Sequence, residues 1–428
     1  MNNKSHLLLY SLGVSFSFWI CSTSAVAAPL VSIGDNTNIF FNGSSSLRWS
    51  SNIFRNEDNE ESDLSWTVSP GLEINVGRGI TNADLTIVTR YDDVSYQDND
   101  QLDTELFHIE ALGSYEISRL NVNASASFDE TKINTPENNL LDDLVELNAT
   151  NVDLDAEYQL SPKFSFSAGY IYSETEYQTY KAFFSDREIT RFPLSIYYEL
   201  TPKLDLILGY THSISEIKGR SRLRAPGVTE VLTGYDKDSD FFHLGLRGSL
   251  LTKLTGYFKI GYRSMSADDS TSFFTVTDIL DPPPNNVTIT DLPPTDRDDS
   301  GMLGIDANLT WMAATKLLMQ LSLSRDFGTG GLGEAVESNS ANLMCNYTIN
   351  NQWSVMANLG YTERDVTNRD SSNFRREDEQ LNGGLRLTYV LNQYWRFSAG
   401  YTYSENESNQ AGSDYESDTL DLTAILRY

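Results

Sequence analysis

Cysteine, histidine and long apolar runs are scarce in this 428-residue chain. It has two cysteines and four histidines, and after residue 28 no apolar run is long enough for a membrane-spanning helix. These shortages exclude an internal disulfide framework, a cluster of cysteine and histidine metal ligands, and a helical membrane protein. The mean hydropathy of -0.37 does not exclude a membrane barrel, because barrel strands alternate lipid-facing apolar residues with polar residues that line the lumen.

Positive charge is also scarce. The chain has 31 lysines and arginines against 60 aspartates and glutamates, which gives a formal net charge of -29. Nucleic-acid-binding proteins carry basic patches that neutralise phosphates. We therefore predict no nucleic-acid partner, and the sequence contains no ATP-binding motif and no pattern that calls for a cofactor or a metal.

The first 27 residues have the features of a signal peptide. Lys4 supplies the positive start, residues 7–20 an apolar core, and residues 25–27 a small-residue cleavage site. A transmembrane anchor is disfavoured because the apolar core is short and contains serine and glycine. A lipoprotein is disfavoured because the bulky Ile20 precedes Cys21. We predict export across an inner membrane, with residues 28–428 forming one mature domain.

The mature domain repeats one kind of hairpin. Residues 158–174 read YQLSPKFSFSAGYIYSE, and related stretches occur at 198–214 and 389–405. Each stretch contains a polar turn followed by a strand in which apolar and polar residues alternate, so the two kinds of residue point to opposite faces. In the first copy one face holds Phe164, Phe166, Ala168, Tyr170 and Tyr172, and the other holds Ser165, Ser167, Gly169 and Ser173.

This pattern extends over the whole mature chain and predicts an all-β fold, a transmembrane antiparallel up-and-down β-barrel of about 18 strands. Short turns and longer polar loops alternate, as in outer-membrane barrels with short periplasmic turns and long extracellular loops. A soluble β-sandwich would have shorter strands and crossover connections. The predicted strands are 39–54, 62–77, 82–96, 102–117, 119–132, 146–160, 163–176, 187–200, 203–217, 239–250, 253–266, 300–312, 315–327, 337–349, 352–366, 377–391, 394–406 and 415–428.

Aromatic residues near both ends of these strands predict two interfacial belts. The last strand alternates Leu420, Leu422, Ala424 and Leu426 up to the terminal Tyr428. An alternating strand that ends on an aromatic residue resembles the signal that barrel-assembly machinery reads in bacterial outer-membrane proteins. We therefore expect an outer-membrane location in a Gram-negative bacterium, with lipids and lipopolysaccharide as neighbours. The expected belt residues are Tyr158, Phe164, Trp311, Tyr347, Trp353, Tyr389 and Trp395 near the short turns, and Tyr170, Tyr172, Tyr210, Tyr262, Tyr361, Tyr401 and Tyr403 near the long loops.

The first hairpin carries a family resemblance. It reads SNIFR at residues 51–55, then an acidic loop, then VSPGL at residues 68–72. It resembles the outer-membrane barrel family found with exopolysaccharide biosynthesis clusters, the "putative beta-barrel porin 2" group. The resemblance implies a barrel through which polysaccharide, or an associated export machinery, crosses the outer membrane. It implies no catalytic residues.

Charged residues on the polar face predict a charged lumen. Acidic residues come mainly from the first half of the chain and basic residues from the second. Facing walls of opposite charge would orient hydrated solutes; alternatively, the charges only solvate the lumen and pair across strands. The lumen residues selected as candidates are Asp153, Asp155, Glu157, Arg263, Arg386 and Arg396.

The segment around 218–224 is the one basic cluster in this acidic chain. Its members, Lys218, Arg220, Arg222 and Arg224, are candidate ligands for anionic polysaccharide or for lipopolysaccharide phosphates. The alternative is a solvated loop. The longest loop, 267–299, contains two proline runs that suggest polyproline II, and it could fold inward or stand outside. Asp236, Asp238 and Asp240 lack calcium-loop spacing, so no metal site is expected.

We predict that the protein is not an enzyme. His108 and Glu110 fall on the lumen face of their strand, and His212 falls on the lipid-facing side of its strand. Neither histidine belongs to a recognisable catalytic arrangement. Three functions remain open: a conduit or accessory for exopolysaccharide export, a general or solute-specific diffusion porin, and a structural barrel with a plugged lumen.

Overall fold

The computed structural model describes residues 29–428 except 78, 80, 135–142, 269–271, 278–286, 292–299, 332–334 and 368–374. The predicted signal peptide and both proline runs of the longest loop lie outside the described residues. Within the described part, the helical content is one short 3-10 turn, η1(Asp100–Leu102). No helix there is long and apolar enough to cross a membrane.

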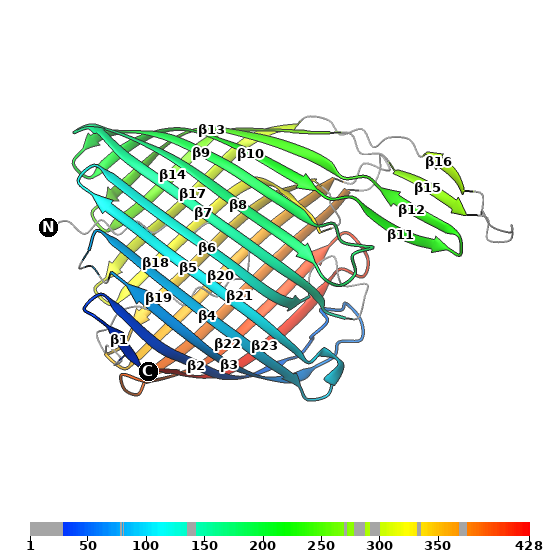
Figure 1. Cartoon of the computed structure of the whole chain (residues 1–428), viewed down its shortest axis with the longest axis horizontal. Coiled ribbons are helices and arrows are strands. Elements are labelled where there is room, and N and C mark those ends of the chain that lie inside the picture. The colour runs from blue at the N-terminus through cyan, green and yellow to red at the C-terminus, as the bar shows by residue number, and fades with distance from the viewer. Residues whose placement is uncertain are drawn as a thin grey trace.

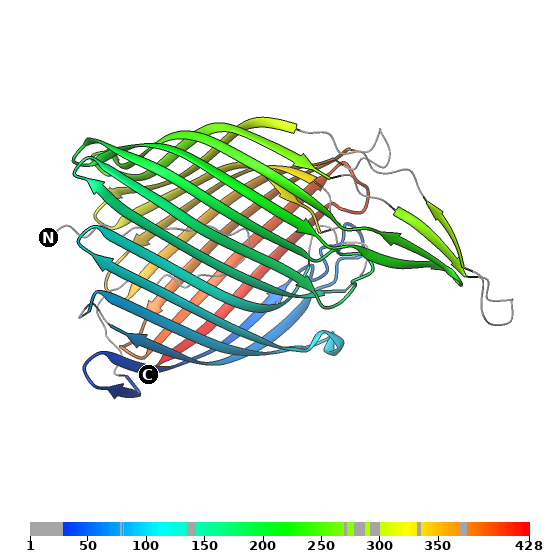
Figure 2. The ribbon, with the colours of Figure 1, turned by 45° about the horizontal axis from the view of Figure 1, so that its top comes forward.

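Eighteen antiparallel strands form a closed barrel (Figures 1 and 2). Each strand pairs with its barrel neighbours along the chain, and β2 pairs with β23 to close the ring from Asn42 opposite Arg427 to Ser50 opposite Thr419. The predicted fold is therefore confirmed, including the even strand number. The strands are β2(Thr37–Ser50), β3(Asp63–Val76), β4(Ala83–Tyr96), β5(Thr104–Ile117), β6(Leu120–Ile133), β7(Val145–Ser161), β8(Phe164–Tyr177), β9(Arg187–Thr201), β10(Leu204–Ile217), β13(Tyr235–Leu251), β14(Leu254–Ala267), β17(Ser300–Ala314), β18(Leu317–Thr329), β19(Ala335–Thr348), β20(Trp353–Thr367), β21(Arg375–Val390), β22(Trp395–Ser408) and β23(Tyr415–Arg427).

One end of the β2–β23 seam lies at the rim that carries the short turns. Tyr428 exchanges two backbone hydrogen bonds with Phe41, at 2.6 and 2.8 Å. A short strand, β1(Val31–Ile33), pairs with the start of β2 beyond this point. The terminal residue thus takes part in ring closure, and both β1 and the C-terminus lie at the short-turn rim (Figure 1).

The first predicted strand was too long at its end. It was expected to reach residue 54, but β2 ends at Ser50. Asn52 is buried there, donates a hydrogen bond to the carbonyl of Asn56 and accepts one from the Asn56 amide. Arg55 adopts a positive φ of 55°. These side-chain to backbone bonds replace the strand ladder and turn the chain inward.

A second sheet of four strands, here called the arm, was not predicted. It consists of β11(Arg220–Ala225), β12(Val228–Leu232), β15(Ser272–Thr277) and β16(Val287–Asp291), in that order. Segments 218–238 and 267–299 had been expected to be loops. Figures 1 and 2 show that the arm projects from the rim opposite the C-terminus, so the described part of the longest loop stands outside the barrel.

The outer wall is apolar and the inner wall is polar. Large apolar side chains are exposed on the outer face of nearly every strand, as Leu194, Leu208, Leu244 and Leu385 illustrate. A soluble protein does not expose an apolar surface of this extent, whereas a barrel in a bilayer requires it. Exposed aromatic residues lie toward both rims of this face: Tyr158, Phe164, Trp311, Tyr347, Trp353 and Trp395 toward the short turns, and Tyr170, Tyr262, Tyr361 and Tyr401 toward the long loops.

Candidate channel lumen

Neutral hydroxyl and amide side chains cover much of the inner wall. On neighbouring strands, Asn151 donates to Ser127 at 3.5 Å and accepts from Ser173 at 2.8 Å. Farther round the ring, the Ser324 and Ser340 hydroxyls lie 2.7 Å apart. Strand alternation places these residues on the face opposite the apolar belt. The lining therefore offers many hydrogen-bond donors and acceptors that carry no charge.

Most of the charged lumen residues are paired. Several basic side chains lie within ion-pair distance of a carboxylate, and some of these pairs join strands that are not neighbours. The pairs are Arg427 with Glu73 at 2.7 Å, Lys259 with Asp306 at 3.3 Å, Arg263 with Asp326 at 2.9 Å and Arg386 with Asp421 at 3.0 Å. This arrangement favours the interpretation in which the charges pair, rather than one of facing walls of opposite charge.

Arg247 makes the most extensive of these contacts. Its guanidinium donates to both carboxylate oxygens of Glu157, at 2.7 and 2.6 Å, and to Asp205 at 3.0 Å. It also lies 3.3 Å from the centroid of the Tyr197 ring. Glu157 is on β7 and Arg247 on β13, and three strands separate them in the sheet. The side chains therefore meet on the lumen side, where they narrow the passage.

The six lumen residues selected from the sequence all lie on the inward face of their strands. Glu157, Arg263 and Arg386 belong to the ion pairs above. Asp153 and Asp155 make no hydrogen bond or ion pair with any described residue, and the same holds for Arg396. The structure thus divides the set into three residues held by partners and three available to solvent or solute.

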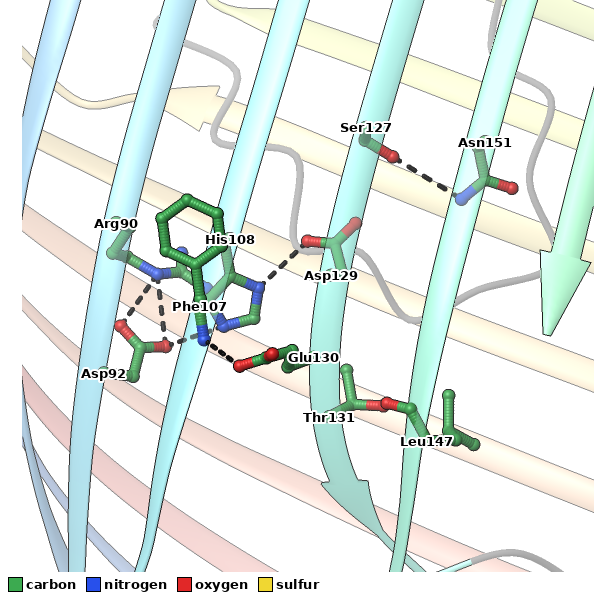
Figure 3. Close-up of polar contacts among 10 residues, drawn as sticks. All are labelled: Arg90, Asp92, Phe107, His108, Ser127, Asp129, Glu130, Thr131, Leu147 and Asn151. Atoms are coloured by element: carbon green, nitrogen blue, oxygen red, sulfur yellow. Dashed lines mark hydrogen bonds and ion pairs between the residues drawn. The ribbon is translucent and has the colours of Figure 1, made fainter. Parts of the chain in front are cut away.

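His108 lies between two carboxylates on adjacent strands (Figure 3). Its Nδ1 is 2.9 Å from Asp129 and its Nε2 is 3.2 Å from Asp92, which also pairs with Arg90 at 2.9 Å. Both ring nitrogens therefore lie near carboxylate oxygens, and the four side chains form a polar network across β4, β5 and β6. Among the described residues, no group of three or more candidate ligands is arranged to hold a metal ion.

His212 lies on the outer face, where the sequence placed it. Its Nδ1 is 2.9 Å from Asp240, which also accepts a hydrogen bond from the Tyr210 hydroxyl at 2.6 Å. These three side chains lie at the long-loop end of β10 and β13. They form a polar collar above the apolar belt and contribute nothing to the lumen.

Three members of the basic cluster at the start of the arm have acidic partners. Lys218 lies 2.8 Å from Glu188 and 3.2 Å from Glu216, and these contacts, that with Glu188 first, raise its pKa above the ordinary lysine value. Glu230 accepts hydrogen bonds from Arg224 and Arg222. The bond from Arg224 is the main reason that the Glu230 pKa lies below the usual glutamate range. The fourth member, Arg220, lies on the same face of β11 as Arg222 and Arg224. A role in holding the arm together is therefore favoured over a free anion-binding patch.

The Glu230→Gln variant is expected to loosen the arm. Its two arginine partners would lose a charged acceptor, at a cost of about 1 kcal/mol, so trypsin should cut after Arg222 and Arg224 faster at neutral pH. The matched control is Asp291→Asn on the opposite edge strand, which removes the same charge. Because the folded pKa of Glu230 is depressed, its contribution is present above the unfolded pKa and is lost as the pH falls through the folded pKa. Equal cleavage of both variants would contradict the role of Glu230 in holding the arm together.

Loops pack across the long-loop rim. Phe54 from the β2–β3 loop, Leu102 from η1 and Leu144 from the β6–β7 loop form one buried cluster. Phe184 from the β8–β9 loop joins a second cluster with Tyr177 and two lumen-facing residues of β7. Near the short-turn rim, by contrast, a cavity of about 380 Å³ opens inside the barrel. Its lining residues are Asn38, Phe40, Asn75, Val76, Gly79, Asp84, Thr86 and Arg427.

The closed barrel, the apolar outer belt and the polar lumen define the class of protein: a porin-like outer-membrane β-barrel. Residues 298–428 match the model of the family described as "Putative beta-barrel porin 2". This match confirms the family resemblance, although it covers the last strands and not residues 51–72, on which the resemblance was based. No curated protein matches the sequence.

Solved structures resemble this fold only at low similarity. The ferric-catecholate import receptor Fiu from E. coli K12 has 9% identity and a TM-score of 0.43, over 92% of this chain and 82% of the receptor. The alcaligin receptor FauA from Bordetella pertussis has 13% identity and a TM-score of 0.39, over 94% and 77%. OccAB3 from Acinetobacter baumannii has 9% identity and a TM-score of 0.38, over 92% and 100%. These scores are too low to transfer any property of those proteins to this chain.

Proposed function

We propose that the protein is an outer-membrane channel that serves as a conduit or accessory for exopolysaccharide export. The observation that carries this proposal is the lumen lined by neutral hydroxyl and amide groups. Sugar polymers present hydroxyl groups along their whole length, and serine and asparagine side chains can exchange hydrogen bonds with them as they do with water. The family resemblance supports the same substrate class.

The pairing of lumen charges also supports a neutral hydrated cargo. Where arginine and lysine are each matched to a carboxylate, the field across the passage is weak, so an uncharged polymer meets no strong electrostatic trap. Lipopolysaccharide and export machinery at the two rims are the partners that this function needs. The energy for transport would come from the partners or from a gradient, since the sequence has no ATP-binding motif.

A structural barrel with a closed lumen is the second candidate. The specific observation in its favour is the set of packed loops at the long-loop rim. A diffusion porin is the third candidate, and it differs from the first in its cargo rather than in its architecture. The three candidates give different results when conductance and polysaccharide secretion are measured together.

The proposal is tested in a deletion strain. Loss of the gene is expected to reduce surface polysaccharide, and the wild-type gene should restore it. The matched variants are Ser127→Trp, which narrows the lumen, and Ala126→Trp, which adds the same bulk to the lipid face. Only the lumen variant should fail to restore secretion. Normal polysaccharide in the deletion strain, together with slower uptake of small solutes, would favour the diffusion porin instead.

A further inference from the structure

The long-loop end of β18 is fastened to residues three to five strands farther round the barrel mouth. Residues 328–331, here called the tip, are the last two residues of β18 and the two residues that follow it. We propose that the tip is the extracellular gate of the channel, and that Lys237 and Arg187 are the latch that holds it shut. This inference rests on the proposed channel function and adds its regulation.

Three hydrogen-bond donors hold the tip. The Lys237 ammonium donates to the carbonyl of Gly328 and to the hydroxyl of Thr329, both at 2.7 Å. The Arg187 guanidinium donates to the carbonyl of Thr329 at 2.7 Å. The backbone amide of Ser185 donates to the carbonyl of Gly331 at 3.1 Å. Two of the three donors are cationic side chains, which make stronger hydrogen bonds than neutral donors.

These contacts cannot run along the wall. In the ring, β10, β13, β14 and β17 lie between β9, which carries Arg187, and β18. The tip therefore contacts strands farther round the mouth, while its first two residues, Gly328 and Thr329, remain paired with Val336 and Ala335 of β19. Lys237, on β13, points inward under the tip, and its side chain is almost completely buried, at 3% exposure.

The packing at the β8–β9 loop fits a glycine at the tip. Phe184, only 2% exposed, stacks on Tyr177 with ring centroids 4.8 Å apart. Gly331 lies against both rings, and a Cβ atom there would be 3.0 Å from the Tyr177 hydroxyl and 3.2 Å from Phe184. The backbone can approach this closely because glycine has no side chain. The β8–β9 loop thus provides the seat against which the tip closes.

The contacts that hold the tip are separable from the contacts that build the barrel. The ladder between β18 and β19 runs from Leu317 opposite Tyr347 to Thr329 opposite Ala335. None of its hydrogen bonds involves Lys237, Arg187 or Ser185. Releasing the latch would therefore leave this ladder intact, and the tip could move outward together with the β19 residues paired to it, which is what a reversible gate requires.

The latch is tested by planar-bilayer recording of the refolded full-length barrel. The variant Lys237→Met/Arg187→Met removes both cationic donors and is expected to raise the open probability about tenfold or more, since each lost bond involves a charged donor. The matched control is Lys181→Met, which removes an exposed lysine of the seat loop that pairs with Glu176. The control should behave as wild type. Heat-modifiable migration on gels verifies that every variant is folded.

A second experiment locks the gate with a cross-link. In a Cys345→Ser background, Thr329→Cys and Lys237→Cys are joined by a short bifunctional methanethiosulfonate, and current should fall to baseline until a reductant is added. A cross-linked barrel that conducts as well as the reduced one would overturn the gate while leaving the channel intact. If the folded latch variant conducts no current at all, the channel function fails and the gate fails with it.

Discussion

Replacing Leu208 by arginine is expected to lower the free energy of unfolding in lipid by about 2–4 kcal/mol. Leu208 is 56% exposed on the outer face of β10, and its cross-strand neighbours are Ile196 and Leu244, which are also exposed. It lies midway between the level of Tyr198 and the level of Tyr210. A guanidinium there would lie near the middle of the bilayer, where a charge loses its hydration.

The control for this prediction is Asn358→Arg. Asn358 is exposed on the lumen face of β20, where water can solvate an added charge. Urea unfolding in phospholipid vesicles should show a large loss for Leu208→Arg and a loss of at most about 1 kcal/mol for the control. Equal losses for the two variants would mean that the outer face does not contact lipid.

Replacing Arg247 by methionine is expected to cost about 2 kcal/mol of stability. The change leaves the Glu157 and Asp205 carboxylates without the guanidinium that joins them, in a place where each is only partly exposed. Removing one partner of such a pair costs more than the pair itself contributes, because a charge is left behind. The unpaired carboxylates should also shift the reversal potential of the open channel toward cation selectivity.

A triple variant separates charge from packing. Glu157→Gln/Asp205→Asn/Arg247→Met removes the whole ion-pair group, so it should recover most of the lost stability and the original reversal potential. Urea unfolding and bilayer recording under a salt gradient measure the two effects. A triple variant as unstable and as cation-selective as the single one would show that the Arg247 contacts do not neutralise these carboxylates.

The wall of the barrel could be predicted from the sequence because strand faces are set by local alternation. Each of the 18 predicted strands overlaps an observed one. The alternation also correctly placed Asp153 and Arg386 on the inward face of their strands. Period-two patterns need no knowledge of distant residues, since a one-residue slip would turn every side chain to the wrong face.

The arm was missed because its signals are short and are interrupted by turn residues. The sequence VTEVL of β12 and the sequence SFFTVT of β15 are rich in β-branched and aromatic residues, which favour strands. Strands of five or six residues next to glycine and proline were assigned to loops. The arginines of β11 were expected either to bind anions or to lie in a solvated loop, whereas Glu230 on β12 pairs with two of them.

The packing at the barrel mouth could not be predicted from any local pattern. Phe184 and Gly331 are far apart in the chain and meet only because the barrel brings β8 and β18 around the same opening. Arg247 and Glu157 likewise meet because the ring curves. The alternation places each of these side chains on a face, but the partner on the other side of the lumen depends on the shape of the whole barrel.

The central claim is that the barrel encloses a water-filled passage closed mainly by its long-loop rim. The most direct test is the planar-bilayer current through a folded variant in which residues 53–60 and 180–184 are replaced by short glycine-serine turns and the latch is removed by Lys237→Met/Arg187→Met. We expect this variant to carry a steady ohmic current, whereas the wild type should conduct only in brief openings. A folded, heat-modifiable barrel that remains non-conducting after these changes would contradict it.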